Sequence, residues 1–484
     1  MQRATGPQGN DREHLDTQRK ALEVNIDTRR YGTFAEIGAG QEVVRWFFRA
    51  GGAAGTIAKS MSAYDMSVSD AIYGKCDRYV SRSRLESMLT YEQQLNIDRL
   101  GEARGDTTAF FTFANTVAAQ SFKGNVECHG WMGVKFQAHP RDQDSQIILH
   151  VRMLDRENAQ QQEALGIVGV NLLYGAFFYH YEPEILLKSL MDGISSSRIE
   201  IDMIEFTGIE FRHVDNRIMS LRLVELGLSE AAMFGPSGEV LQPSEVLYKR
   251  PVIVERGSFR PVTHVNLDMI RCTREKFLAE ADATGEEPLE LFEITMRNLR
   301  AEGSIDLKDF LARADVLSAC GMTVLISDYF EFYRLAGYLS QFTKKRIGLV
   351  MGVPTLIDLF DVTYYANLEG GILEAFGRLF KNDHKLYIYP IRNSDGSLTT
   401  TETLDFSSEL KKLFGYLVEC GWIEQLENYN AQYLSIFSRD VLKKIQSRDA
   451  AWETMVPERV AEIIKKRGLF GHRTDRSVVP ARQS

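Results

Sequence analysis

The chain has 484 residues, 44% of them hydrophobic and 25% charged, which is the composition of a globular protein with room for more than one domain. The net charge of −9 argues against a general nucleic-acid binder, because such proteins present a basic surface. No apolar run reaches the roughly 20 residues of a membrane-spanning helix, and the polar N-terminus lacks the apolar core of a secretory signal.

Polarity and periodicity then divide the chain into five segments. Residues 1–30 and 468–484 are polar and are expected to be mobile tails. Residues 31–122 are expected to be mainly helical, because helix-forming residues with apolar positions at helical spacing dominate them. Residues 123–405 are expected to form an α/β body, and residues 406–467 a C-terminal helical segment.

Within the body, short apolar runs alternate with amphipathic stretches. This order predicts a largely parallel sheet of Rossmann-like type, because each parallel connection needs a crossover, usually a helix. Residues 281–288 are expected to be a loop, followed by helices through residue 314. The expected strands are residues 126–136, 147–153, 199–206, 231–234, 252–254, 323–327, 347–351 and 386–389.

A strand–turn–helix motif at residues 252–275 organises this body. The apolar run at 251–254 predicts a buried strand, the glycine and proline of 257–261 predict a turn, and a helical period begins near His264. A helix that starts at the carboxyl end of a buried strand directs unpaired N–H groups above the sheet, a position that suits a phosphate. The side-chain donors of the same stretch are Arg256, Arg260, Thr263 and His264.

Each candidate functional residue of this region can have either a binding or catalytic role or a purely structural one. Arg256 and Arg260 can clamp a phosphate or carboxylate, or they can pair with neighbouring acids at the surface. His264 can act as a proton donor to a phosphate, or it can be bound locally at the helix start. Asp328 follows a buried strand, where it can hold Mg²⁺ or a ribose, or cap a helix that is expected to begin near Tyr329.

The segment GSFRPVTHVNLDM resembles the first motif of the nicotinate and nicotinamide mononucleotide adenylyltransferases, G-[ST]-F-[ND]-P-[IV]-x-x-x-H-L. In that family the Gly-Ser-Phe turn follows the first Rossmann strand, and a T/HxxH-type pair binds the ATP phosphates. Thr263 takes the first position of this pair, whereas Asn266 stands at its second His and Arg260 at the usual Asn or Asp. The matching residues are Gly257, Ser258, Phe259, Pro261, Val262 and Leu267.

The proteins that the chain resembles are bacterial. The resemblance implies a nucleotide-handling protein that transfers an adenylyl group from ATP to a pyridine mononucleotide, with Mg²⁺ as a cofactor. It implies catalytic roles for His264 and Arg260, and a partner that is a nucleotide or another phosphorylated small molecule. Two alternatives remain: a nucleotide-binding protein without turnover, and a non-catalytic interaction protein; assembly into a homo-oligomer also stays open. The residues implied to bind the nucleotide are Gly257, Ser258, Phe259, Thr263, Arg256 and Asp328.

The cysteines and the first histidine of the body complete the sequence-based expectations. The five cysteines are odd in number and lack CxxC spacing, which predicts reduced thiols in a cytoplasmic protein and no metal site. Cys128 and His129 are neighbours on an expected strand and therefore face opposite sides of the sheet. We interpret this pair as structural, not catalytic.

Overall fold

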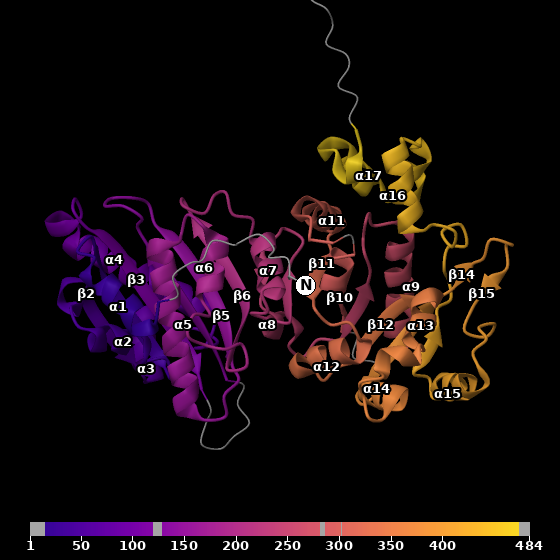
Figure 1. Ribbon diagram of the computed structural model, residues 1–484, viewed down its shortest axis with the longest axis horizontal. Coiled ribbons are helices and arrows are strands. Elements are labelled where there is room, and N and C mark those ends of the chain that lie inside the picture. The colour runs from indigo at the N-terminus through magenta and orange to yellow at the C-terminus, as the bar shows by residue number, and fades with distance from the viewer. Residues whose placement is uncertain (1–14, 120–127, 281–285, 302, 474–484) are drawn as a thin grey trace, which may run out of the picture. The chain divides into compact units, whose positions relative to one another are not determined.

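The computed structural model describes residues 15–119, 128–280, 286–301 and 303–473, and the chain divides into two compact units (Figure 1). Unit 1 ends at Ser229 and unit 2 begins at Glu230. This boundary falls inside residues 123–405, which the sequence analysis treats as one body. The chain separates there because each unit builds its own sheet. Residues 1–14 and 474–484 of the expected tails lie outside the described residues.

Unit 1 contains a six-stranded sheet in the order β2-β1-β3-β4-β5-β6. Strand β1 pairs in parallel with β2 and β3, and the remaining pairs are antiparallel. The expected helical segment 31–122 thus also contains three strands. Strands β1 and β3 are buried almost throughout and lack the alternation that marks a half-buried strand. The bounds are β1 (Arg30–Gly38), β2 (Ile57–Ala63), β3 (Ala109–Ala118), β4 (His129–Phe136), β5 (Ser145–Met153) and β6 (Ile199–Gly208).

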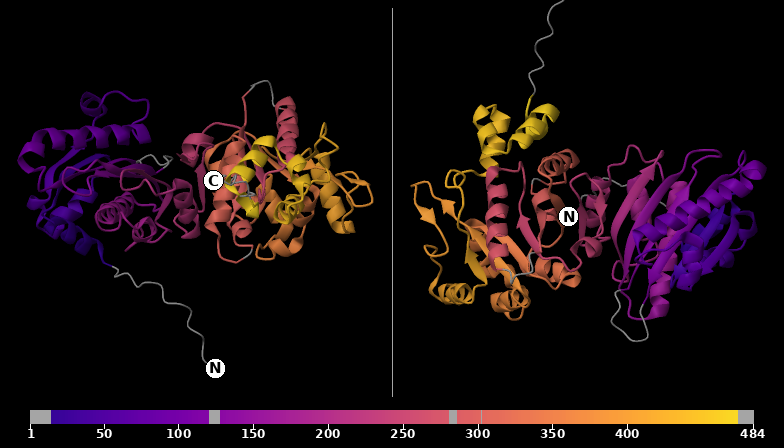
Figure 2. Two further views of the ribbon diagram at one scale, coloured as in Figure 1. Left: turned by 90° about the horizontal axis from the view of Figure 1, so that it is seen from above. Right: turned by 180° about the vertical axis from the view of Figure 1, so that it is seen from behind.

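Helices cover both faces of this sheet (Figures 1 and 2). Helices α1 (Thr17–Ile26), α2 (Val43–Ala50), α5 (Asn158–Phe178) and α6 (Pro183–Ser189) share one apolar core with it. Helix α4 (Arg82–Arg104) packs on β1, β3 and β4, and its buried side chains lie outside that core. The remaining helices are α3 (Met66–Tyr73) and α7 (Asn216–Glu225).

Helix α1 corrects the expectation of a mobile tail as far as residue 30. Asp16 caps the helix by accepting a hydrogen bond from the Arg19 N–H. The ammonium group of Lys20 is buried and lies 2.7 Å from both Asn171 Oδ1 and Asp192 Oδ2. A polar composition conceals this helix, because its buried lysine is paired inside the unit instead of solvated.

Unit 2 contains an eight-stranded sheet in the order β16-β13-β12-β9-β10-β11-β7-β8. The six strands from β16 to β11 are parallel. Numbered in chain order from β9, they lie across the sheet, from β11 to β16, in the order 3-2-1-4-5-6 of a Rossmann-type fold. The predicted fold class, a largely parallel α/β sheet of this type, is confirmed. The bounds are β7 (Ala231–Phe234), β8 (Val240–Leu241), β9 (Val252–Arg256), β10 (Leu289–Thr295), β11 (Thr323–Ser327), β12 (Ile347–Gly352), β13 (His384–Tyr389) and β16 (Ile423–Gln425).

Strand β10 lies beside β9, in the part of the chain that was expected to be loop and helices. The helices of unit 2 again lie on both faces of the sheet (Figure 1). Helices α12 (Phe332–Phe342), α13 (Val353–Leu359), α14 (Gly371–Leu379) and α15 (Ser408–Glu419) share a core with Val252 and Val254. Helices α9 (His264–Glu280) and α11 (Leu307–Ala319) pack on the opposite face.

The remaining elements of unit 2 are short. A hairpin joins β14 (Ile391–Arg392) to β15 (Leu398–Thr399). Helices α16 (Ser438–Ser447) and α17 (Glu458–Arg467), yellow in Figure 1, follow the sheet, and α17 packs on α11. The others are α8 (Pro243–Leu247) and α10 (Met296–Leu299). Across both units, no helix in the described residues is long and apolar enough to cross a membrane.

Candidate functional site

A pocket lies at the carboxyl ends of the parallel strands of unit 2. The chain runs outward from β9 through β10 to β11, and then returns to place β12 on the other side of β9. Ligands of open α/β sheets bind at the carboxyl edge near such a reversal. The pocket encloses about 250 Å³. It is lined by the end of β9, the end of β10 with α10, the segment after β11, and α13 with the segment that follows it.

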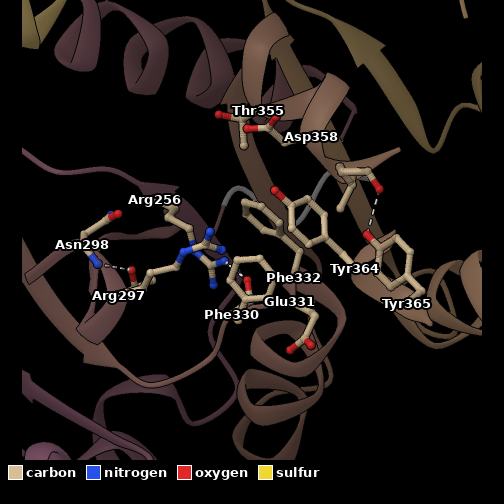
Figure 3. A pocket seen from close by; sticks show the side chains of 12 residues that line it. Arg256, Arg297, Asn298, Phe330, Glu331, Phe332, Thr355, Asp358, Tyr364 and Tyr365 are labelled. Carbon is tan, nitrogen blue, oxygen red and sulfur yellow. Dashed lines mark hydrogen bonds between the residues drawn. The ribbon is translucent and has the colours of Figure 1, made fainter. Parts of the chain in front are cut away.

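Arg256, the last residue of β9, forms one side of this pocket (Figure 3). Its Nε and Nη2 donate to the two carboxylate oxygens of Glu293 at 2.7 and 3.0 Å, and Nη1 donates to the Phe330 carbonyl at 2.6 Å. The guanidinium also lies 4.2 Å from the centre of the Phe332 ring. Because the Glu293 side chain is fully buried, Arg256 is held rigidly and its charge is neutralised within the protein.

Arg297, on the short helix α10, supplies the second guanidinium of the pocket. Its guanidinium lies over the Phe330 ring, with 4.2 Å between the guanidinium carbon and the ring centre (Figure 3). Unlike Arg256, Arg297 forms no ion pair within the described part of the chain, and its side chain is exposed. An unpaired guanidinium held on an aromatic ring keeps its donors available to an anion.

The opposite side of the pocket combines aromatic rings with acids and a hydroxyl. Tyr364 meets Phe330 edge to face, with ring centres 5.0 Å apart. Glu331 and Asp358 contribute carboxylates, and Thr355 contributes a hydroxyl group. The pocket therefore offers positive groups, flat apolar surfaces and negative groups within one small volume.

A magnesium ion fits this pocket only together with a ligand. No cluster of three or more metal-binding side chains is present in the described ranges of the chain. Mg²⁺, however, is commonly held by one or two carboxylates together with substrate phosphates and water. Asp358 can supply one such carboxylate, whereas Glu331 faces Arg334, with 3.9 Å between Oε2 and Nη1.

Residues 257–259, the first of the turn after β9, do not line the pocket. Phe259 is buried, meets Phe292 with ring centres 5.3 Å apart, and is the residue of this turn with a positive φ, 46°. Gly257 leaves room for it, because a Cβ there would lie 2.9 Å from the Phe259 ring. Ser258 is exposed, and its carbonyl accepts a hydrogen bond from Arg313 at 3.2 Å.

Arg260 is not part of the pocket lining either. Its Nε lies 2.6 Å from Asp309 Oδ1 on α11, and Asp309 accepts a further hydrogen bond from Arg313 Nε at 2.7 Å. Of the two arginines that could clamp an anion, Arg256 thus lies in the pocket, whereas Arg260 lies outside the lining and pairs with Asp309.

Thr263 and Asn266 close the N-terminal turn of α9. The Thr263 N–H and hydroxyl both donate to Asn266 Oδ1, at 2.8 and 2.9 Å, and Asn266 Nδ2 donates to Glu255 Oε1 at 2.6 Å. Burial raises the pKa of Glu255 to about 8, although the bond from Asn266 opposes this shift. Asn266 therefore has a structural task at the position that a histidine occupies in the motif.

His264 and Asp328 lie outside the pocket lining. The His264 ring stacks on Tyr433, with ring centres 4.8 Å apart, and burial lowers the pKa of the imidazole. Asp328 is exposed, and the helix that follows it begins at Phe332 with Glu331 as the N-cap residue, so Asp328 does not cap it. The helix therefore begins three residues later than the expected start near Tyr329.

Arg297, Thr295 and Asn298 are the pocket residues that the sequence analysis missed most completely. Thr295 ends β10, which was not expected to be a strand, and Arg297 and Asn298 lie on α10 directly after it. One sequence signal could have revealed them. Residues 291–294 are mostly apolar and polar residues follow soon after them, as is also the case at β9.

Comparisons with known proteins identify no family. No family model matches the chain, and no curated protein matches it. Among solved structures, a competence/damage-inducible protein from Agrobacterium tumefaciens matches with 16% identity, covering 33% of this chain and 94% of its own at a TM-score of 0.25. Competence damage-inducible protein A from Klebsiella pneumoniae matches with 13% identity, 33% and 96% coverage and a TM-score of 0.26. Similarities at this level carry no argument about this chain.

Proposed function

We propose that unit 2 binds a nucleotide, or a similar phosphorylated small molecule, in the pocket at the carboxyl edge of its sheet. The observation that carries this proposal is the guanidinium of Arg297. It forms no ion pair within the described residues and lies over the Phe330 ring, in the same pocket as the already neutralised Arg256. Planar guanidinium groups match the geometry of phosphate oxygens.

The rest of the lining suits the other parts of a nucleotide. Phe330 and Tyr364 present aromatic surface against which a base can pack. Asp358 would help to hold a Mg²⁺ ion that binds together with the phosphates. The volume of about 250 Å³ is small among ligand pockets, which favours a mononucleotide over a dinucleotide.

Adenylyl transfer from ATP to a pyridine mononucleotide is the reaction that the motif resemblance suggests. It would require the reacting phosphates to reach His264 or Arg260, and both lie outside the pocket lining. We therefore infer binding without turnover as the simpler function, and the same experiment tests the reaction.

The experiment compares Arg297→Gln with Arg300→Gln, an exposed arginine three residues farther along and outside the lining. Thermal shift and calorimetry with ATP, the two pyridine mononucleotides and NAD, each with and without Mg²⁺, should show stabilisation of the wild type by at least one compound. Arg297→Gln should weaken that binding roughly ten-fold or more, because a hydrogen bond to a charged group contributes about 1.5–3 kcal/mol. Arg300→Gln should leave it unchanged.

Two results would count against this function. One is a wild type that binds none of these compounds at millimolar concentration, and the other is equal loss of binding in the two arginine variants. Pyrophosphate release from ATP and a mononucleotide would instead establish turnover and replace the simpler proposal by adenylyl transfer.

A further inference from the structure

A row of three polar side chains crosses the sheet of unit 1. His150 Nδ1, on β5, lies 2.6 Å from Asp202 Oδ1, on β6. His150 Nε2 lies 2.9 Å from Nδ1 of His129, on β4. The side chains of His150 and Asp202 are 1% and 3% exposed, whereas His129 is half-buried. The row therefore runs from the interior of the unit toward its surface.

A β-bulge places Asp202 in this row. His150 pairs with Met203 and Val151 with Ile201, so that Asp202 is the extra residue of β6. Ile201 and Ile204 both belong to the apolar core of unit 1, although a regular strand would send residues three positions apart to opposite faces. The bulge turns Asp202 toward His150, as bulges beside functional sites commonly do.

The hydrogen-bond order follows from the carboxylate at one end. A carboxylate only accepts, so His150 donates from Nδ1 to Asp202. Where His150 is neutral, its Nε2 is then an acceptor for the N–H of His129 Nδ1. This order leaves a lone pair on His129 Nε2, for which no partner is found among the described residues. Trp131 packs against the His150 ring, with centres 4.9 Å apart, and keeps the middle of the row dry.

We propose that His129, His150 and Asp202 form a reactive site in unit 1, in which Nε2 of His129 is a general base toward the hydroxyl group of a small molecule or of water. The hydroxyl proton would pass to Nε2, and the oxygen would keep the electron pair. The proton on His129 Nδ1 would move to His150 Nε2, so that the positive charge rests beside the Asp202 carboxylate.

The surroundings agree with this role. Burial lowers the pKa of His129 to about 4, with His150 adding to the effect, so its imidazole is neutral at pH 7; the Asp202 carboxylate acts in the opposite direction and raises this pKa. The neighbouring carboxylate Glu200 is engaged elsewhere, because it accepts from Arg152 at 2.9 Å and from Ser229 at 2.6 Å. Glu200 therefore offers a control of equal charge on the same strand.

The test measures the reactivity of His129 toward diethylpyrocarbonate in the full chain, by peptide mass spectrometry, with exposed His139 as the internal reference. Asp202→Asn removes the charge at the inner end of the row and should slow labelling of His129 roughly ten-fold or more relative to His139. Glu200→Gln should leave the ratio unchanged. Equal labelling of His129 in the wild type and Asp202→Asn would overturn the proposal.

A second measurement covers the case in which Asp202→Asn does not fold. In the wild type, ¹⁵N-histidine NMR should show His129 protonated at Nδ1 and unprotonated at Nε2. The opposite tautomer would mean that the row presents an N–H instead of a base, and would contradict the proposal. Because this site lies in unit 1, both outcomes are independent of nucleotide binding in unit 2.

Discussion

Glu255 shows what one buried residue does to the pH dependence of stability. Its raised pKa of about 8 means that the folded protein keeps a proton that the unfolded chain releases near its ordinary value of 4.5. Between these values the folded state binds more protons than the unfolded state, so the free energy of unfolding falls as pH rises.

Glu255→Gln should therefore reduce the loss of stability of unit 2 between pH 5 and pH 8, by at most roughly 1.4 kcal/mol per pH unit. Urea unfolding at the two pH values measures this difference. Glu275→Gln, a half-exposed glutamate on α9, is the control and should leave the pH dependence as in the wild type. An unchanged slope in Glu255→Gln would mean that Glu255 is ionised in the folded protein.

At the residue scale, the sequence identified Arg256 as an anion-binding candidate because of its place at the end of an apolar strand. It could not show that Arg260 would find Asp309, which lies 49 positions away in the chain. Ion pairs of this kind depend on how α11 packs, and the local spacing of residues carries no information about that.

At the scale of elements, the turn after β9 is tied to α11 by Asp309. This carboxylate pairs with Arg260 and Arg313, and Arg313 in turn donates to the Ser258 carbonyl. Asp309→Asn should lower the stability of unit 2 by about 1–3 kcal/mol, because it removes the charge that two partly buried arginines share.

Nucleotide binding by Asp309→Asn should change little, since Asp309 is not part of the pocket lining. The expected pattern is thus the reverse of that for Arg297→Gln, which affects binding and leaves stability alone. Chemical denaturation and calorimetry on the two variants measure both quantities. A large loss of affinity in Asp309→Asn would show that the turn contributes to the pocket.

The strands that could be predicted were the short apolar runs bounded by turn residues, such as β9, β11 and β12. Strand β10 was missed because LELFEIT places polar residues at intervals that also suit an amphipathic helix. Its strand conformation is imposed by pairing with β9 and β11 on its two sides. Missing β10 also hid Arg297, so the error in the fold became an error in the site.

At the scale of the whole molecule, we expect residues 1–229 and 230–484 to fold as separate proteins. Each unit has its own sheet and its own apolar core. The two residues at the boundary are held within their own units: Ser229 donates to Glu200, and Glu230 accepts from Tyr329 and Arg334. Each fragment should unfold cooperatively when it is expressed alone.

A cut between residues 122 and 123 is the control for that experiment. It separates β3 from β4, which are paired in the middle of the unit 1 sheet, and should give insoluble or unfolded fragments. Circular dichroism during thermal unfolding distinguishes the cases. If the fragments divided at residue 229 also fail to unfold cooperatively, the two units depend on each other for folding.

The sheet of unit 2 ends on strands of two and three residues, β8 and β16. Long open edges invite neighbouring chains to add strands, which is a common route from native protein to aggregates and amyloid-like fibres. Edges this short offer few backbone groups for that reaction. Unit 2 should therefore stay dispersed in concentrated solution, and a helix or side-chain surface is the better candidate for any self-association of this unit.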